Sequence, residues 1–244
     1  MGEHHSGCLT CGAPLEYLRA AERVRCILCG TEGESAARCA AGHFVCDACH
    51  SGSAKDVIER ACLAAEGDDP LAIARALMRH PKLKLHGPEH HFLVPAALLA
   101  ARANATGRRG DLPRLLAEAR RRSDPVGGGF CGFQGACGAA IGAGIYVSLA
   151  TGATPLAGEP WALANGATAR ALDVLARVGG PRCCKRTTGL VLLAAARTSR
   201  EKLGVRLSTS AAPCEFSDAN AECIEARCPF YPRSEASASA SASA

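Results

Sequence analysis

The sequence is poor in aromatic residues, which make up 4% of its 244 residues, and it contains one tryptophan. It also lacks a strong charge of either sign, because 28 Lys and Arg oppose 23 Asp and Glu and leave a net charge of +5. This small excess does not indicate a protein dedicated to nucleic acid or to a membrane surface. A disordered chain is excluded, since 48% of the residues are hydrophobic and can bury a core.

The first residues, Met1 to Cys8, lack the apolar run of a secretion signal. We therefore expect a reducing, cytoplasmic environment, in which clustered cysteines bind metal or catalyse reactions rather than form disulfides. The sequence contains 15 cysteines, an odd number that disulfides alone do not use up. The stretch 126–158 has no charged residue, but its many glycines predict a buried helix and not a membrane span.

Changes of composition along the chain predict a mainly α fold, in which a small module precedes a helical Cys/His-rich metal-binding domain. Residues 1–52 are expected to form a zinc-ribbon or treble-clef-like module, 53–82 a helical connector, 83–233 the all-helical domain and 234–244 a disordered Ala/Ser tail.

Helix-capping residues and apolar periodicity place the expected helices. Ser53 and Asp69 are typical N-caps, so the connector should contain two helices. Pro95 should bend or restart the first helix of the large domain. The helices expected there are 88–104, 112–122, 135–149, 160–178 and 181–203, and strand signal is nearly absent apart from 205–207.

Two Cys-x2-Cys knuckles open the chain, Cys8–Cys11 and Cys26–Cys29, and each is followed by a glycine. A tight turn of this kind supplies two thiolates to a tetrahedral zinc ion. The next set, Cys39-x3-His43-x2-Cys46-x2-Cys49, also contains four zinc ligands. We therefore expect two zinc ions, held by Cys8, Cys11, Cys26, Cys29, Cys39, His43, Cys46 and Cys49.

Two ligand arrangements fit this string. In the sequential one, the two knuckles of 8–29 form a zinc-ribbon site and the set 39–49 forms the second site. In the cross-brace, the first and third ligand pairs share one ion. We favour the sequential arrangement because each set is locally complete, and we favour His43 over His50 as the fourth ligand. Sites without an open position are structural or adaptor-like and not reaction centres.

Eight further cysteines follow the module. Cys62 falls in the middle of a predicted helix, where a buried thiol acts as a small hydrophobic group. The others fall in a glycine-rich loop, at a helix start after Pro181 and in an irregular C-terminal loop. They are Cys131, Cys137, Cys183, Cys184, Cys214, Cys223 and Cys228.

These three elements have features of an iron–sulfur site. Glycines beside the loop cysteines let the main chain approach a bulky group, and a helix start stabilises thiolate charge. Adjacent helical residues diverge by about 100°, so one of the two vicinal cysteines should face the site. We predict one cluster, of the 4Fe–4S type. Its expected ligands are Cys131, Cys137, one of Cys183 and Cys184, and Cys223 or Cys228.

A histidine-rich segment, Lys84-Leu85-His86-Gly87-Pro88-Glu89-His90-His91, begins the large domain. Neutral imidazole and carboxylate groups can ligate metal or move protons near neutral pH. The alternative is a helix-capping carboxylate with surface histidines. Lys185 and Arg186 could hold an anion, and one vicinal thiol could exchange with a substrate. The catalytic candidates are therefore His86, Glu89, His90, His91, Cys184 and Lys185.

Four motifs resemble an uncharacterised cysteine-rich family of anaerobic bacteria and archaea. They are His86-Gly87-Pro88-Glu89-His90-His91, the stretch from Gly128 through Cys131 and Cys137 to Gly142, Gly179-Gly180-Pro181-Arg182-Cys183-Cys184-Lys185-Arg186, and Cys228-Pro229-Phe230-Tyr231. The resemblance covers nearly the whole of residues 1–231, and members are sometimes fused to methyltransferase domains. It implies an anaerobic, metal- or sulfur-centred role without assigning a reaction.

We hypothesise an iron–sulfur-dependent enzyme that acts on a sulfur-containing or redox-active small substrate, by sulfur transfer, desulfuration or a redox step. One alternative is a non-catalytic zinc-binding adaptor, and another is a cysteine-based carrier of methyl or sulfur groups. The zinc module could dock a reductase or a methyltransferase, and a homodimer is compatible with the sequence. Neither a membrane nor nucleic acid is an expected partner.

Overall fold

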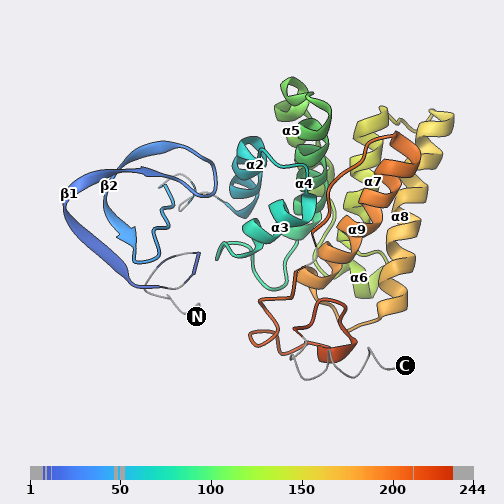
Figure 1. The fold of residues 1–244 in the computed structure, drawn as a ribbon. Coiled ribbons are helices and arrows are strands. Elements are labelled where there is room, and N and C mark those ends of the chain that lie inside the picture. Colours follow the sequence, from blue (N-terminus) through green and yellow to red (C-terminus); the bar gives the residue numbers. More distant parts are fainter. Residues whose placement is uncertain are drawn as a thin grey trace, which may run out of the picture.

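The computed structural model describes residues 8, 10–11, 13–46, 49, 53–210 and 212–232. A curved two-stranded hairpin stands beside a larger helical domain, and the C-terminal loop lies at one end of the helices (Figure 1). The prediction of a mainly helical chain is therefore confirmed. The predicted disordered tail, 234–244, lies outside the described residues, as does His50.

The N-terminal hairpin consists of β1 (Leu15–Arg25) and β2 (Glu32–Cys39), which pair antiparallel. Leu15 pairs with Cys39 at one end and Arg25 with Glu32 at the other, and the register shifts between them. Sequence analysis did not place these strands, because their many charged residues give no strong alternation of apolar and polar side chains. Cysteines of the N-terminal module lie at or next to the ends of these strands.

The connector contains the two expected helices, α2 (Ala54–Ala64) and α3 (Pro70–Met78). Ser53 and Asp56 form a reciprocal capping box at the start of α2. The Asp69 carboxylate accepts hydrogen bonds from the amides of Leu71 and Ala72, at 2.8 and 3.1 Å. The predicted caps are confirmed.

The central helix is α4 (Glu89–Thr106), which packs against α2, α3, α5, α7 and α9. It continues as one element through Pro95, so the helix does not restart there, which was one of the two effects expected of this proline. Most of its side chains are buried, so tertiary packing outweighs the hydrogen bond that the proline removes.

The remaining helices lie close to their expected positions. The weak strand signal at 205–207 does not correspond to a strand, because this segment follows the last long helix without strand pairing. None of the described helices combines the length and hydropathy needed to cross a bilayer. The elements are η1 (Arg109–Asp111), α5 (Leu112–Ser123), α6 (Phe130–Phe133), α7 (Gly138–Thr151), α8 (Gly158–Val178), α9 (Cys184–Leu203) and η2 (Glu225–Arg227).

Two glycines let α7 approach α4 closely. A Cβ added at Gly142 would lie 2.9 Å from Pro95 Cδ and 3.0 Å from the carbonyl oxygen of His91. One added at Gly138 would lie 2.3 Å from the His91 ring. Any side chain at these positions would push the start of α7 away from the first turns of α4.

Replacing Gly142 with alanine should therefore destabilise the protein by about 1–3 kcal/mol, because the added methyl group overpacks the contact between α4 and α7. Gly166→Ala in α8 is the matched control, since the atom nearest to its added Cβ is at 3.6 Å. This control should be neutral or stabilising by up to about 1 kcal/mol through helix propensity. Urea unfolding measures both changes, and equal stabilities of the two variants would contradict the packing argument.

Candidate metal centres

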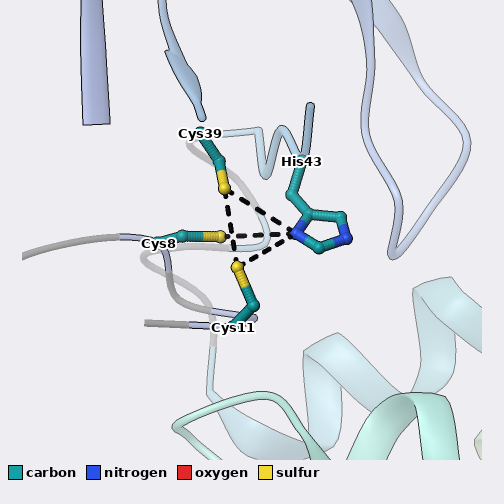
Figure 2. Close-up of side chains that lie close together, drawn as sticks. All are labelled: Cys8, Cys11, Cys39 and His43. Carbon is teal, nitrogen blue, oxygen red and sulfur yellow. Dashed lines mark hydrogen bonds between the residues drawn. The ribbon is translucent and has the colours of Figure 1, made fainter. Parts of the chain in front are cut away.

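The first group of metal-ligand side chains joins the start of the described chain to the end of β2. The Sγ atoms of Cys8, Cys11 and Cys39 surround Nδ1 of His43 (Figure 2). The distances to Nδ1 are 3.8 Å from Cys8, 3.3 Å from Cys11 and 3.8 Å from Cys39. The Sγ atoms of Cys11 and Cys39 are 3.5 Å apart.

The second group lies between the hairpin turn and the helical domain. It consists of Cys26, Cys29, Cys46 and Cys49, and the Sγ atoms of Cys29 and Cys46 are 3.7 Å apart. Cys26 and Cys49 are buried in the core that includes α2 and α3. This group therefore also attaches the N-terminal module to the rest of the protein.

The ligands are cross-braced, so the expected sequential arrangement, with one zinc-ribbon site from the two knuckles, is wrong. The first knuckle precedes β1 and the second lies in the turn between the strands, which puts them at opposite ends of the hairpin. Antiparallel pairing brings Leu15 opposite Cys39, and the Ile27 amide donates to the Phe44 carbonyl at 3.0 Å. These contacts bring the first knuckle, Cys8 and Cys11, to Cys39 and His43. They bring the second knuckle, Cys26 and Cys29, to Cys46 and Cys49.

Both groups have the chemistry and spacing of a tetrahedral metal site. Four ligands around one zinc ion lie about 3.8 Å apart, since Zn–S bonds are near 2.3 Å. Burial raises the pKa of Cys39, but hydrogen bonds from the Ala41 amide and the Cys11 thiol lower it to about 6. The pKa of Cys29 is likewise lowered to about 6 against the effect of burial. Each group thus contains a thiol that ionises readily, and the two sites can bind metal ions.

A third collection of thiols lines a cavity between α9 and the C-terminal loop. Cys183, the N-cap of α9, faces Cys214, Cys223 and Cys228 of the loop across this space of about 60 Å³. Burial raises the pKa of Cys214, and the thiols of the other three raise it further because like charges repel. We call this set the four-thiol pocket.

Hydrogen-bond donors point at three thiols of the four-thiol pocket. The amides of Phe216 and Glu225 donate to Cys214 and Cys223, at 3.4 and 3.3 Å. Each amide lies two residues after its cysteine, as Thr10 and Ala41 do after Cys8 and Cys39 in the N-terminal module. The Asn220 side chain and the Arg186 amide donate to Cys183, at 3.5 and 3.4 Å.

The vicinal cysteines belong to different surroundings, because Cys183 is the N-cap of α9 and Cys184 its first helical residue. Burial, together with the charges of Cys137, Cys183 and Cys131, raises the pKa of Cys184 to about 11. Sequence analysis expected the three cysteine elements to meet at one point. The structure brings Cys183, Cys214, Cys223 and Cys228 to one pocket, and Cys131, Cys137 and Cys184 are not among the residues that line it.

Two candidate catalytic residues of the histidine-rich segment are tied into the fold. His90 is 1% exposed and hydrogen-bonds to Thr188 Oγ1 and the Lys84 carbonyl, each at 3.1 Å. Its burial lowers the pKa to about 3, so the ring stays neutral. The Glu89 carboxylate accepts from the Lys84 amide at 2.9 Å. These contacts favour structural roles at the start of α4.

The other two histidines make different contacts. His91 Nδ1 donates to the Val126 carbonyl at 2.9 Å. His86 Nε2 lies 3.1 Å from both Asn220 Oδ1 and a Glu222 carboxylate oxygen. Since both atoms accept, the His86 proton is on Nε2. His86 therefore fixes the orientation of Asn220, whose amide nitrogen faces Cys183.

The two cations expected to hold an anion are occupied internally. Lys185 Nζ donates to the carbonyls of Met78 and Leu83, at 2.9 and 2.8 Å, and lies 4.7 Å from the centroid of the Phe216 ring. Desolvation lowers its pKa to about 8. Arg186 donates to the carbonyls of Gly179 and Pro181. Neither side chain is free to bind an anion in this arrangement.

Sequence reasoning missed two residues of the four-thiol pocket. Cys214 lay in the C-terminal cysteine element but received no role, although its position in a loop with Cys223 and Cys228 was the available signal. Asn220 gave no signal, because its importance comes from long-range contacts. Cys62 is fully buried in α2, as expected, and burial raises its pKa.

The fold and these thiol groups define a mainly helical, cysteine-rich protein with two sites that can hold metal ions. Over residues 58–231 the chain matches a family described as a family of unknown function, DUF5714, and it belongs to that family. No curated protein and no solved structure matches the chain. The expected resemblance to an uncharacterised family is thereby confirmed.

Double variants can test the cross-brace directly. Cys8→Ser/Cys39→Ser changes two ligands of one group, so it should lose one metal ion per chain. Cys8→Ser/Cys26→Ser has the same number of substitutions but changes both groups, so it should lose two. Elemental analysis of the purified variants measures the loss. The sequential arrangement gives the opposite result, and finding it would contradict the geometry.

Proposed function

We propose that the chain is an iron–sulfur metalloprotein of sulfur or redox chemistry, with a cluster in the four-thiol pocket and two zinc ions in the N-terminal module. The observation that carries this proposal is the set of four thiols around one cavity, three of which accept hydrogen bonds. Iron–sulfur clusters are held by four cysteine thiolates, and hydrogen bonds to the sulfurs tune them.

A cluster suits this set of thiols better than a single ion. Among the described residues, only the two N-terminal groups bring three or more ligand atoms all within 4.8 Å of one another, and the four-thiol pocket is not such a group. A cubic cluster is held by thiolates that lie farther apart than the ligands of one ion, because iron and sulfide ions stand between them.

The charges and walls around the pocket also suit an anionic inorganic group. Buried Lys185 lines the pocket, and although desolvation lowers its pKa, the charges of Glu89, Cys184, Cys183 and Cys214 favour its charged form. Apolar side chains, among them Met78 and Leu192, complete the lining. A positive charge in a desolvated, apolar site offsets the cost of burying several thiolates.

A cluster bound here would supply one-electron redox chemistry. The residues of the chain would hold it, shield it from water and set its potential through donors such as Asn220. Because His90, Glu89 and Lys185 are engaged internally, we assign them to the scaffold rather than to proton transfer. The substrate class we propose is a sulfur-containing or redox-active small molecule.

The N-terminal module would be structural in this scheme. Its second group packs against α2 and α3, whereas the hairpin carries many exposed charged residues. Four-ligand sites leave no position for a substrate. The module is therefore proposed to stabilise the fold and to offer the hairpin to a protein partner such as a reductase.

Anaerobically purified protein should absorb broadly near 400 nm and contain iron and sulfide. The variant Cys214→Ala/Cys228→Ala should lose about four irons per chain, because it removes half of the ligands of the pocket cluster. Cys62→Ala, which changes a buried thiol in α2, is the control and should keep its iron. Zinc in place of iron would contradict the proposal and support a zinc-binding adaptor.

The amide of Asn220 should influence the reduction potential of the cluster proposed for the four-thiol pocket. Its amide reaches Cys183 Sγ at 3.5 Å, and such a donor stabilises the more negative, reduced cluster. Asn220→Leu should therefore make the potential more negative, as measured by a redox titration followed by electron paramagnetic resonance. Asn220→Gln, which keeps an amide, should shift it less. An unchanged or more positive potential in Asn220→Leu would contradict this role.

A further inference from the structure

The long helix α8 stands at the edge of the helical domain (Figure 1). Its main contacts are with α7 and α9, and of its 21 residues Ala167 and Ala171 are the buried ones. Buried residues mark the side of a helix that packs against its neighbours, so the opposite side of α8 faces solvent. A helix of this length offers a free face about 30 Å long.

The middle of this free face is a row of alanines. Ala162, Ala169 and Ala176 are all exposed, and each is seven residues from the next. Residues at this spacing fall within about 40° of one another around a helix, which is the arrangement of a seam between two packed helices. We call these three residues the alanine seam. Their short side chains would let the backbone of a second helix approach closely.

Large apolar side chains lie exposed at the start of the same helix. Trp161, next to the alanine seam, is 52% exposed, and Leu156, two residues before α8, is 98% exposed. They are two of the four large apolar side chains that are exposed among the described residues. Apolar groups that gather at one place on a surface are typical of a protein contact, and tryptophan is enriched in such contacts.

The charges beside the alanine seam complement a second copy of α8. Glu159 lies in the first turn and Arg177 in the last, and both are exposed. They are about five full turns apart, so they lie on the same side of the seam. Asp173 pairs with Arg177 at 2.9 Å and keeps its guanidinium group near the seam.

This pattern selects an antiparallel partner. When two copies of a helix pack antiparallel about a two-fold axis, residues on the same side of the seam face each other. With Ala169 of both copies at the centre, Glu159 comes within about 3 Å of the level of the partner's Arg177 along the helix axis. A parallel pair would bring the two acidic ends together and offers no such pairing. Antiparallel helix dipoles also attract each other.

We propose that the chain forms a symmetric homodimer through the free face of α8, with the two helices antiparallel and centred on Ala169. Ala162 of each copy then packs on the partner's Ala176, and the symmetry produces the Glu159–Arg177 pair twice. Trp161 and Leu156 extend the contact at both ends of the helix pair.

The dimer is independent of the metal proposed for the four-thiol pocket. Cys183 follows the last residue of α8, Val178, by five positions, so each pocket is near the C-terminal end of its own α8. Antiparallel packing separates these ends by about the length of the helix, roughly 30 Å. Each pocket therefore stays complete within one chain, and either proposal can fail without the other.

Analytical ultracentrifugation of the purified full-length chain tests the dimer. At micromolar concentration the wild type should sediment with twice the mass of one chain, and Ala169→Arg should sediment as a monomer because it places a charge at the centre of the seam. Ala117→Arg, at an exposed alanine of α5, is the matched control and should stay dimeric. Urea unfolding checks that both variants fold.

A monomeric wild type would overturn the proposal and leave the free face of α8 to a different partner. A folded Ala169→Arg variant that stays dimeric would overturn it as well, because the dimer would then use another surface.

Exchange of the two charges tests the antiparallel arrangement. Glu159→Arg and Arg177→Glu should each weaken the dimer about three- to tenfold, since each places like charges opposite one another twice. The double variant Glu159→Arg/Arg177→Glu restores opposite charges and should recover most of the wild-type dissociation constant. A double variant as weak as the sum of the single ones would contradict the antiparallel pairing.

Discussion

The packing of α4 against the starts of α7 and α9 is the constraint on which the positions of the thiols depend. Gly138 and Gly142 allow α7 to lie directly on His91 and Pro95, which brings the glycine-rich loop to the first turn of α4. Lys185 Nζ binds the carbonyls of Met78 and Leu83 and so fixes the start of α9 against the segment that joins α3 to α4. Cys183, at this helix start, then lines the four-thiol pocket, whereas its neighbour Cys184 does not.

Buried polar groups maintain this arrangement. His90, Glu89 and Arg186 satisfy backbone donors or acceptors that would otherwise be buried without partners. His86 continues the same network to Asn220, and Asn220 continues it to Cys183. The histidine-rich segment is thus connected to the four-thiol pocket through the amide of Asn220.

Local signals in the sequence predicted the local structure well. Ser53, Asp69 and the glycines at helix ends placed the helices, because capping depends on neighbouring residues. Ligand types in the N-terminal module were likewise readable from Cys-x2-Cys spacing. Their pairing was not, since it depends on the hairpin, whose charged strands hide the pattern of alternation. The division of Cys183 and Cys184 also required the tertiary arrangement.

The central claim, a cluster in the four-thiol pocket, is tested most directly by X-ray absorption at the iron and zinc edges of anaerobically isolated protein. The account predicts iron surrounded by sulfur, with scattering from neighbouring iron atoms that a single ion does not give, and zinc in the N-terminal module alone. A protein in which zinc is the only metal, bound at all the thiol groups, would contradict it.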